Sequence, residues 1–111
     1  MLTATDITII REVARYRSRA ICHILWQIHI EGFDNDPEFS SEYQEAWRQF
    51  ELFRLLSKNP GGLFQIFPPE DIGLFISEFT KRKLDLDDIE TTSLFGKLCY
   101  YRNYNYTISL N

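Results

Sequence analysis

The sequence predicts a mainly helical α+β fold, with helices over most of the chain and a β-hairpin at its C-terminal end. Through most of the chain apolar residues recur every three or four positions, as they do along one face of a helix. After Phe95 the pattern changes to alternate positions, which is typical of a strand. The 111 residues are 44% hydrophobic and 15% aromatic, which is enough for one domain with a real core.

A long helix is predicted over residues 6–31, ending at Gly32. At 100° per residue one side of this helix is apolar and carries Ile10, Val13, Ala14, Ala20, Ile21, Ile24, Leu25 and Ile28. Arg17 projects from the middle of this stripe. Because a buried unpaired guanidinium is costly, we expect Arg17 to have a carboxylate partner or to reach the edge of the core.

The opposite side of this helix changes from basic to apolar along its length. Its first half carries three arginines at i, i+4 spacing, Arg11, Arg15 and Arg19. The same line continues with three apolar residues, Cys22, Trp26 and Ile30. A helix that is apolar on both sides is usually buried on both. Either later elements of the chain cover this face, or a second copy does.

A twofold pairing of first helices would cover the face directly, since such a contact repeats one patch on both copies. We therefore expect a homodimer with Trp26 near the centre of its interface. The residues predicted at the interface are Cys22, Trp26, Ile30 and Arg17.

The middle of the chain predicts a loop over 33–39, a second helix capped by Ser40 or Ser41, and a stop at 59–62. The short apolar run 63–67 fits a single buried strand. Prolines and carboxylates at 68–71 then begin another helix that ends with the basic run 81–83. Its predicted core stripe is Ile72, Phe75, Ile76 and Phe79.

The last part of the chain predicts a short helix within 84–94 and a hairpin over 95–110, with Arg102 and Asn103 as the turn. One face of this hairpin would carry Phe95, Cys99, Tyr101, Tyr104, Tyr106, Ile108 and Leu110. The element order from residue 40 matches a winged-helix arrangement. Residues 1–111 are thus predicted to form a single domain, with 6–31 as a dimerisation arm and 40–111 as a compact winged-helix-like part.

The winged-helix arrangement suggests a DNA-binding regulator as an alternative function, but the charges argue against it. The net charge is −4, and an acidic domain gains little from phosphate electrostatics. The segment 86–94 would be the recognition helix, yet it begins with Asp87, Asp88 and Glu90 and lacks the side chains that usually read base edges. Nucleic acid is therefore not an expected partner.

A second alternative is a calcium-binding helix-loop-helix over 34–45. The carboxylates at positions 1, 3, 5, 9 and 12 of such a loop would be Asp34, Asp36, Glu38, Glu42 and Glu45. Phe39 stands at position 6, where the turn requires glycine, and Pro37 stiffens position 4. An acidic loop that runs into a helix N-terminus explains the same residues, so no metal is favoured.

The remaining signals describe a non-catalytic protein. No nucleophile motif, phosphate-binding loop or cluster of Cys and His ligands occurs, so neither enzymatic activity nor a cofactor is expected. Two isolated cysteines, Cys22 and Cys99, are expected to be reduced, buried thiols. No apolar run reaches the roughly 18 residues that a membrane span needs. We therefore expect a soluble cytoplasmic protein. The aromatic residues suit a protein interface as well as a core. The expected function is a small acidic interaction or regulatory module that self-associates and binds an unidentified protein.

Overall fold

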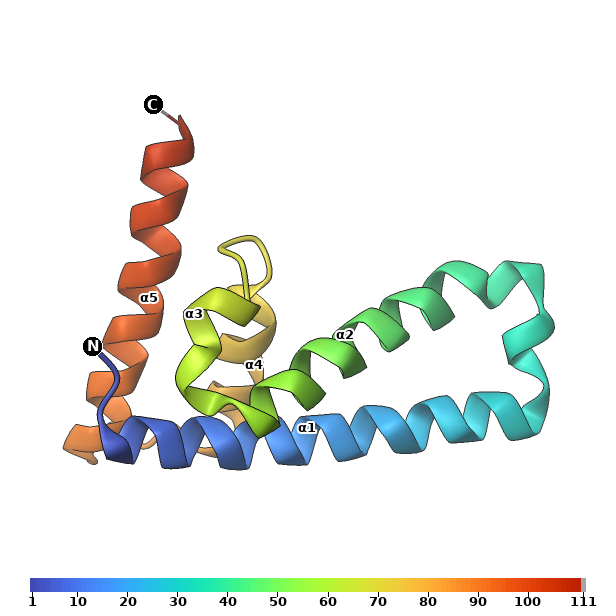
Figure 1. Cartoon of the computed structure of the whole chain (residues 1–111), viewed down its shortest axis with the longest axis horizontal. Coiled ribbons are helices and arrows are strands. Elements are labelled where there is room, and N and C mark those ends of the chain that lie inside the picture. The colour runs from blue at the N-terminus through green and yellow to red at the C-terminus, as the bar shows by residue number, and fades with distance from the viewer. Residues whose placement is uncertain (111) are drawn as a thin grey trace.

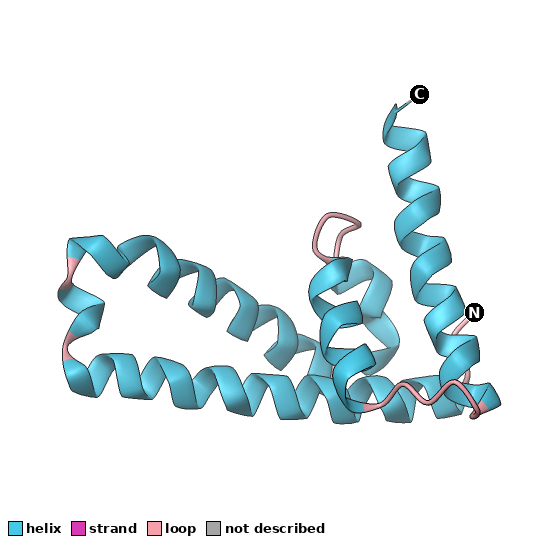
Figure 2. Ribbon diagram, turned by 180° about the vertical axis from the view of Figure 1, so that it is seen from behind, coloured by secondary structure: helices cyan, strands magenta, loops and turns pink. Residues whose placement is uncertain are grey.

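The computed structural model describes residues 1–110, and its side chains are described except for Asp34 and residues 104–110. It contains five α-helices and three short 3-10 segments (Figures 1 and 2). No strand occurs among the described residues, so the predicted α+β class is wrong and the fold is all-α. The molecule measures 45 × 34 × 23 Å, and its long axis follows the first helix.

The first helix, α1 (Ala4–Glu31), confirms the predicted long helix and begins two residues earlier. The Thr3 hydroxyl accepts a hydrogen bond from the Asp6 backbone N–H at 3.1 Å, and the Asp6 carboxylate accepts one from the Thr3 backbone N–H at 2.9 Å. This reciprocal capping box satisfies two backbone donors that a helix start leaves open. Gly32 ends the helix with φ +79°, a left-handed conformation that glycine adopts without steric cost.

Two 3-10 turns, Phe33–Asn35 and Pro37–Phe39, reverse the chain into α2 (Ser40–Lys58). Neither predicted serine caps α2, because the N-cap position is Phe39 and makes no side-chain cap. The Phe33 and Phe39 rings pack together instead, with their centroids 5.1 Å apart. The two long helices form an antiparallel hairpin whose tip projects away from the rest of the molecule (Figure 1).

The predicted strand over 63–67 is wrong, because this run forms the single-turn helix α3 (Leu63–Ile66), which follows a 3-10 turn at Pro60–Gly62. Leu63 and Phe67 are fully buried, while Gln65 between them is exposed. A strand would place all three on one face, whereas a spacing of four residues places the first and last on one face of a helical turn. An apolar run of five residues fits both periods, and here the helical one forms.

The predicted hairpin over 95–110 is also wrong, since α5 (Ile89–Leu110) is one continuous helix that passes through Arg102 and Asn103. The described residues that α5 turns inward follow helical spacing: Thr91, Leu94, Phe95, Leu98 and Tyr101. The predicted alternation at Tyr104, Tyr106, Ile108 and Leu110 lies outside the described side chains. Without a strand or a wing in the described chain, the winged-helix arrangement is wrong as well.

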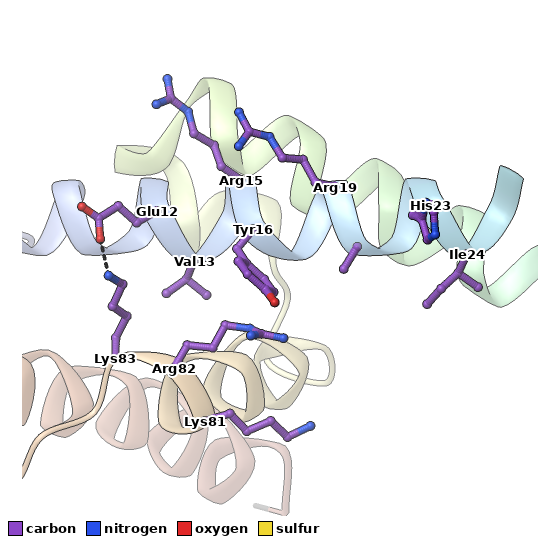
Figure 3. Close-up of a pocket in the computed structure, with 11 residues that line it drawn as sticks. Glu12, Val13, Arg15, Tyr16, Arg19, His23, Ile24, Lys81, Arg82 and Lys83 are labelled. Atoms are coloured by element: carbon purple, nitrogen blue, oxygen red, sulfur yellow. Dashed lines mark ion pairs between the residues drawn. The ribbon is translucent and has the colours of Figure 1, made fainter. Parts of the chain in front are cut away.

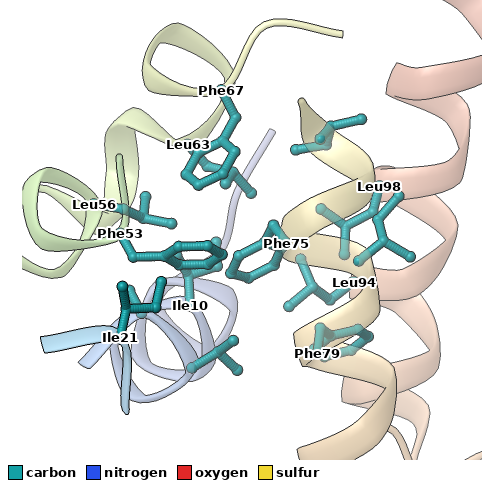
Figure 4. Close-up of a cluster of buried hydrophobic side chains, with 14 of the residues drawn as sticks. Ile10, Ile21, Phe53, Leu56, Leu63, Phe67, Phe75, Phe79, Leu94 and Leu98 are labelled. Atoms are coloured by element: carbon teal, nitrogen blue, oxygen red, sulfur yellow. The ribbon is translucent and has the colours of Figure 1, made fainter. Parts of the chain in front are cut away.

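The core gathers around α4 (Ile72–Arg82), and its predicted stripe is confirmed because all four apolar residues are buried. Buried side chains reach α4 from α1, α2, the α3 turn and α5 (Figure 4). A row of rings crosses this core from Phe53 to Phe67, Phe75, Phe79 and Phe95, with successive centroids 5.2 to 6.5 Å apart. At this spacing ring pairs add to the stabilisation from burial.

Candidate interaction face on the first helix

The projecting half of α1 is uncovered on its outer side. Trp26 is 60% exposed and Ile30 is 64% exposed, and Cys22 on the same line is also exposed. We call these three residues the apolar patch. From Cys22 to the end of α1 only Leu25 is buried. Neither the aromatic residues of α2 nor the described side chains of α5 cover the patch. Burial of the patch by these later elements therefore does not explain its apolar character.

A basic groove lies between the middle of α1 and the C-terminal end of α4 (Figure 3). Its volume is about 1000 Å³, and it opens to solvent. Val13, Tyr16, Ala20 and Ile24 form its apolar part. Val13, Tyr16 and Ile24 lie on the side of α1 that faces α4 (Figure 3). The charged and polar residues that line it are Glu12, Arg15, Arg19, His23, Lys81, Arg82 and Lys83.

A buried carboxylate holds two arginines beside the groove. Glu78 of α4 accepts a hydrogen bond from Arg82 Nε at 3.0 Å, and Arg17 Nε lies 3.6 Å from its other carboxylate oxygen. The Arg82 guanidinium also lies 3.5 Å from the centroid of the Tyr16 ring, which is close enough for a cation–π contact. The expected carboxylate partner of Arg17 is therefore confirmed as Glu78. Whether Arg17 also belongs to an interface stays a prediction.

The remaining cations of the groove differ in their partners. Lys83 pairs with Glu12 at one end of the groove (Figure 3). Arg15 and Arg19 extend from α1 on the side away from α4, and Lys81 extends from α4 (Figure 3). All three are exposed and have no ion-pair partner among the described residues. A protein with net charge −4 thus concentrates unpaired positive charge along one groove. Such a groove attracts a carboxylate-bearing or other anionic partner.

Asp36 and Glu45, two of the carboxylates that the calcium alternative would need, make other contacts. The Asp36 carboxylate accepts the Glu38 backbone N–H at 2.9 Å, as in a local turn. The Glu45 carboxylate instead binds Arg48, and this hydrogen bond, together with one from Gln49, lowers its pKa to about 2. The side chain of Asp34 lies outside the described residues. Within the described part of the chain, no group of three or more Cys, His, Asp or Glu side chains is arranged to hold a metal ion.

Cys22 and Cys99 are free thiols, but the expectation that both are buried is wrong, because Cys22 is exposed and Cys99 is half-buried. Among the described residues, none of the helices combines the length and apolar composition that a membrane span requires.

The fold and this face define the chain as an all-α protein whose first helix carries a basic groove and an apolar patch. Comparison with protein-family models, with curated proteins and with solved structures gives no significant match.

Proposed function

We propose that this chain is a non-catalytic protein-interaction module that self-associates through the outer face of α1. The observation that carries the proposal is the exposure of the apolar patch on a helix whose other face is already buried. Cores of interfaces are enriched in aromatic residues, and tryptophan is among the side chains that contribute most to binding. A twofold contact would bury the patch of each copy against that of the other.

A second aromatic surface supports binding of a different protein as well. Phe33 and Phe39 at the hairpin tip are partly exposed, and so is Trp47 on α2. Exposed aromatic side chains that project from the molecule are typical of a surface that binds another macromolecule. The proposal places the protein in the cytoplasm, where free thiols such as those of Cys22 and Cys99 stay reduced.

The proposal is tested by sedimentation of the native protein and of Trp26→Ala at micromolar concentration. We expect the native protein to be a dimer and the variant to shift towards monomer, because removing a large ring from an interface centre typically costs ~2 kcal/mol or more. Trp47→Ala is the matched control, since it removes the same side chain from an exposed position on the other long helix. Native protein that sediments as a monomer, or an equal shift in both variants, would show that the patch does not mediate self-association.

A further inference from the structure

The segment between α4 and α5 carries a second exposed apolar feature, and it is acidic. Leu86 is 75% exposed and Ile89 is 85% exposed. Four acidic residues stand next to these two in the sequence: Asp85, Asp87, Asp88 and Glu90. We call residues 85–90 the acidic segment. Its mixture of exposed aliphatic and acidic side chains is the complement of the groove, which is apolar with basic rims.

Local hydrogen bonds hold the acidic segment in one conformation. The Asp85 carboxylate accepts the Asp87 backbone N–H at 3.0 Å, and the Asp88 carboxylate accepts the Glu90 backbone N–H at 3.1 Å. The Thr91 hydroxyl donates to the Asp85 carbonyl at 2.7 Å. The segment is thus already ordered with its aliphatic side chains exposed, which reduces the conformational entropy lost on binding.

The positions of the groove and the acidic segment suit a reciprocal contact. The segment follows Lys83, which lies at one end of the groove and pairs with Glu12 there. From this point the chain leads away from the groove (Figure 3), so the groove is not filled by the segment of its own chain. The segment begins two residues after Lys83 in the chain, so a twofold axis beside this end of the groove would bring the segment of each copy to the groove of the other.

We propose that the basic groove of one copy binds the acidic segment of a second copy. This inference rests on the proposed self-association and names the contact that accompanies the apolar patch. In this contact Arg19 of α1 and Lys81 of α4, which both line the groove, pair with the carboxylates of Asp87 and Glu90, and the exposed aliphatic pair meets the apolar part of the groove. A nucleic acid is the poorer occupant, since the four carboxylates beside the groove and Glu12 at its rim would repel phosphates.

The test is a charge exchange between two variants. The groove variant carries Arg19→Glu and Lys81→Glu, and the segment variant carries Asp87→Lys and Glu90→Lys. All four side chains are exposed, so we expect each variant to fold, and circular dichroism is used to check this. Each variant alone places like charges opposite one another, so we expect its self-association to be weaker than that of the native protein by about tenfold or more.

An equimolar mixture of the two variants should restore association. In the mixed dimer one contact is the native basic groove with a native acidic segment, and the other has both charges reversed. Leu86→Ser with Ile89→Ser provides a second measurement that leaves the charge unchanged, and it should also weaken association. A mixture that associates no better than either variant alone overturns the inference.

The outcomes separate the inference from the proposed function. If Trp26→Ala disrupts the dimer but both charge variants dimerise like the native protein, the acidic segment is not in the interface and the proposed function stands. If the native protein is monomeric at high micromolar concentration, self-association itself is wrong. The inference then fails with it.

Discussion

Replacing Asp6 with asparagine should destabilise the whole fold, because this carboxylate joins the start of α1 to α5. Asp6 is only 2% exposed, and it accepts hydrogen bonds from the Thr3 backbone N–H and from the Lys97 ammonium group. The asparagine side chain would keep the size of the original but remove its charge. The asparagine keeps one acceptor oxygen, so the variant weakens the helix cap and removes the charge attraction between two helices far apart in the sequence.

The expected loss follows from these two contacts. Loss of an N-terminal capping contact typically costs about 1 kcal/mol. A hydrogen bond to a charged group contributes about 1.5–3 kcal/mol, and the lower end applies here because Lys97 is 27% exposed and can be hydrated in the variant. The free energy of unfolding should fall by about 2–3 kcal/mol at neutral pH, which for a chain of this length lowers the melting temperature by roughly 10 °C.

The effect of Asp6 should disappear in acid. Burial by itself raises the pKa of the Asp6 carboxyl, but the hydrogen bonds from Lys97 and Thr3 and the charge of Lys97 outweigh it, so the pKa lies below its ordinary value. A carboxyl with a lowered folded pKa stabilises the protein fully above its unfolded pKa of about 4. This stabilisation is lost as the pH falls through the folded pKa. The difference between native protein and variant should therefore be largest near pH 7 and shrink below about pH 4.

Urea unfolding followed by circular dichroism measures these differences. Lys97→Met removes the other partner, and the double variant should lose less than the sum of the single losses, since both changes break one contact. Glu51→Gln is the control, because the ion pair of Glu51 with Arg54 is exposed and such pairs contribute little. An Asp6→Asn variant as stable as the native protein at pH 7, or a difference that persists unchanged into acid, would refute the reasoning.

The remaining predictions concern two glycines on helices and the hydroxyl of Tyr101. Gly32→Ala should lower the free energy of unfolding by about 1 kcal/mol, because the left-handed φ of +79° is strained for alanine. Gly96→Ala should raise it by about 0.5–1 kcal/mol, because this position is in the exposed interior of α5 and the new methyl group meets nothing within 4 Å. Thermal unfolding compares the two variants, and equal shifts in melting temperature would contradict the assigned backbone conformations. Tyr101→Phe should lose about 1 kcal/mol, since the Tyr101 hydroxyl donates to the carbonyls of Phe64 and Phe67 at 3.2 and 3.0 Å. Burial raises the pKa of the Tyr101 hydroxyl. The hydroxyl therefore stabilises the fold fully below about pH 10, and this stabilisation is lost as the pH rises through the folded pKa. If Tyr101→Phe lowered the free energy of unfolding equally at pH 7 and pH 11, this prediction would be wrong.

The sequence predicts α1 and α4 because the spacing of their apolar residues fits a helix and does not fit a strand. The stripe of α1 repeats at helical spacing over many turns and ends at a glycine, and α4 begins after prolines and ends in basic residues. The pattern of α5 is ambiguous. Apolar residues occupy most positions from 94 to 101, which fits a period of two as well as 3.6, and Gly96 argues locally against a helix. Packing of Leu94 and Leu98 against the core decides in favour of the helix.

The groove could not be predicted from the sequence, although each of its parts was visible there. The arginine line of α1 and the basic run 81–83 both fit a solvated helix surface and a favourable helix end. They meet only because α4 packs beside the middle of α1. The i,i+4 spacing of Glu78 and Arg82 on α4 is visible in the sequence, but the contact of Glu78 with Arg17 of α1 is not. The spacing of residues along the sequence does not predict such tertiary contacts between distant segments.

In the proposed dimer, the separation of charges on this surface offsets the repulsion expected between two copies of a protein with net charge −4. Two copies with the same net charge repel at long range, but at physiological ionic strength charges separated by more than ~8 Å are largely screened. The proposed close pairs of Arg19 and Lys81 with Asp87 and Glu90 would then act almost alone. In the proposed dimer the apolar patch supplies affinity that does not depend on salt, while the groove and the acidic segment fix the orientation of the two copies. A partner with the same apolar surface but without the acidic side chains would satisfy only the first of these requirements.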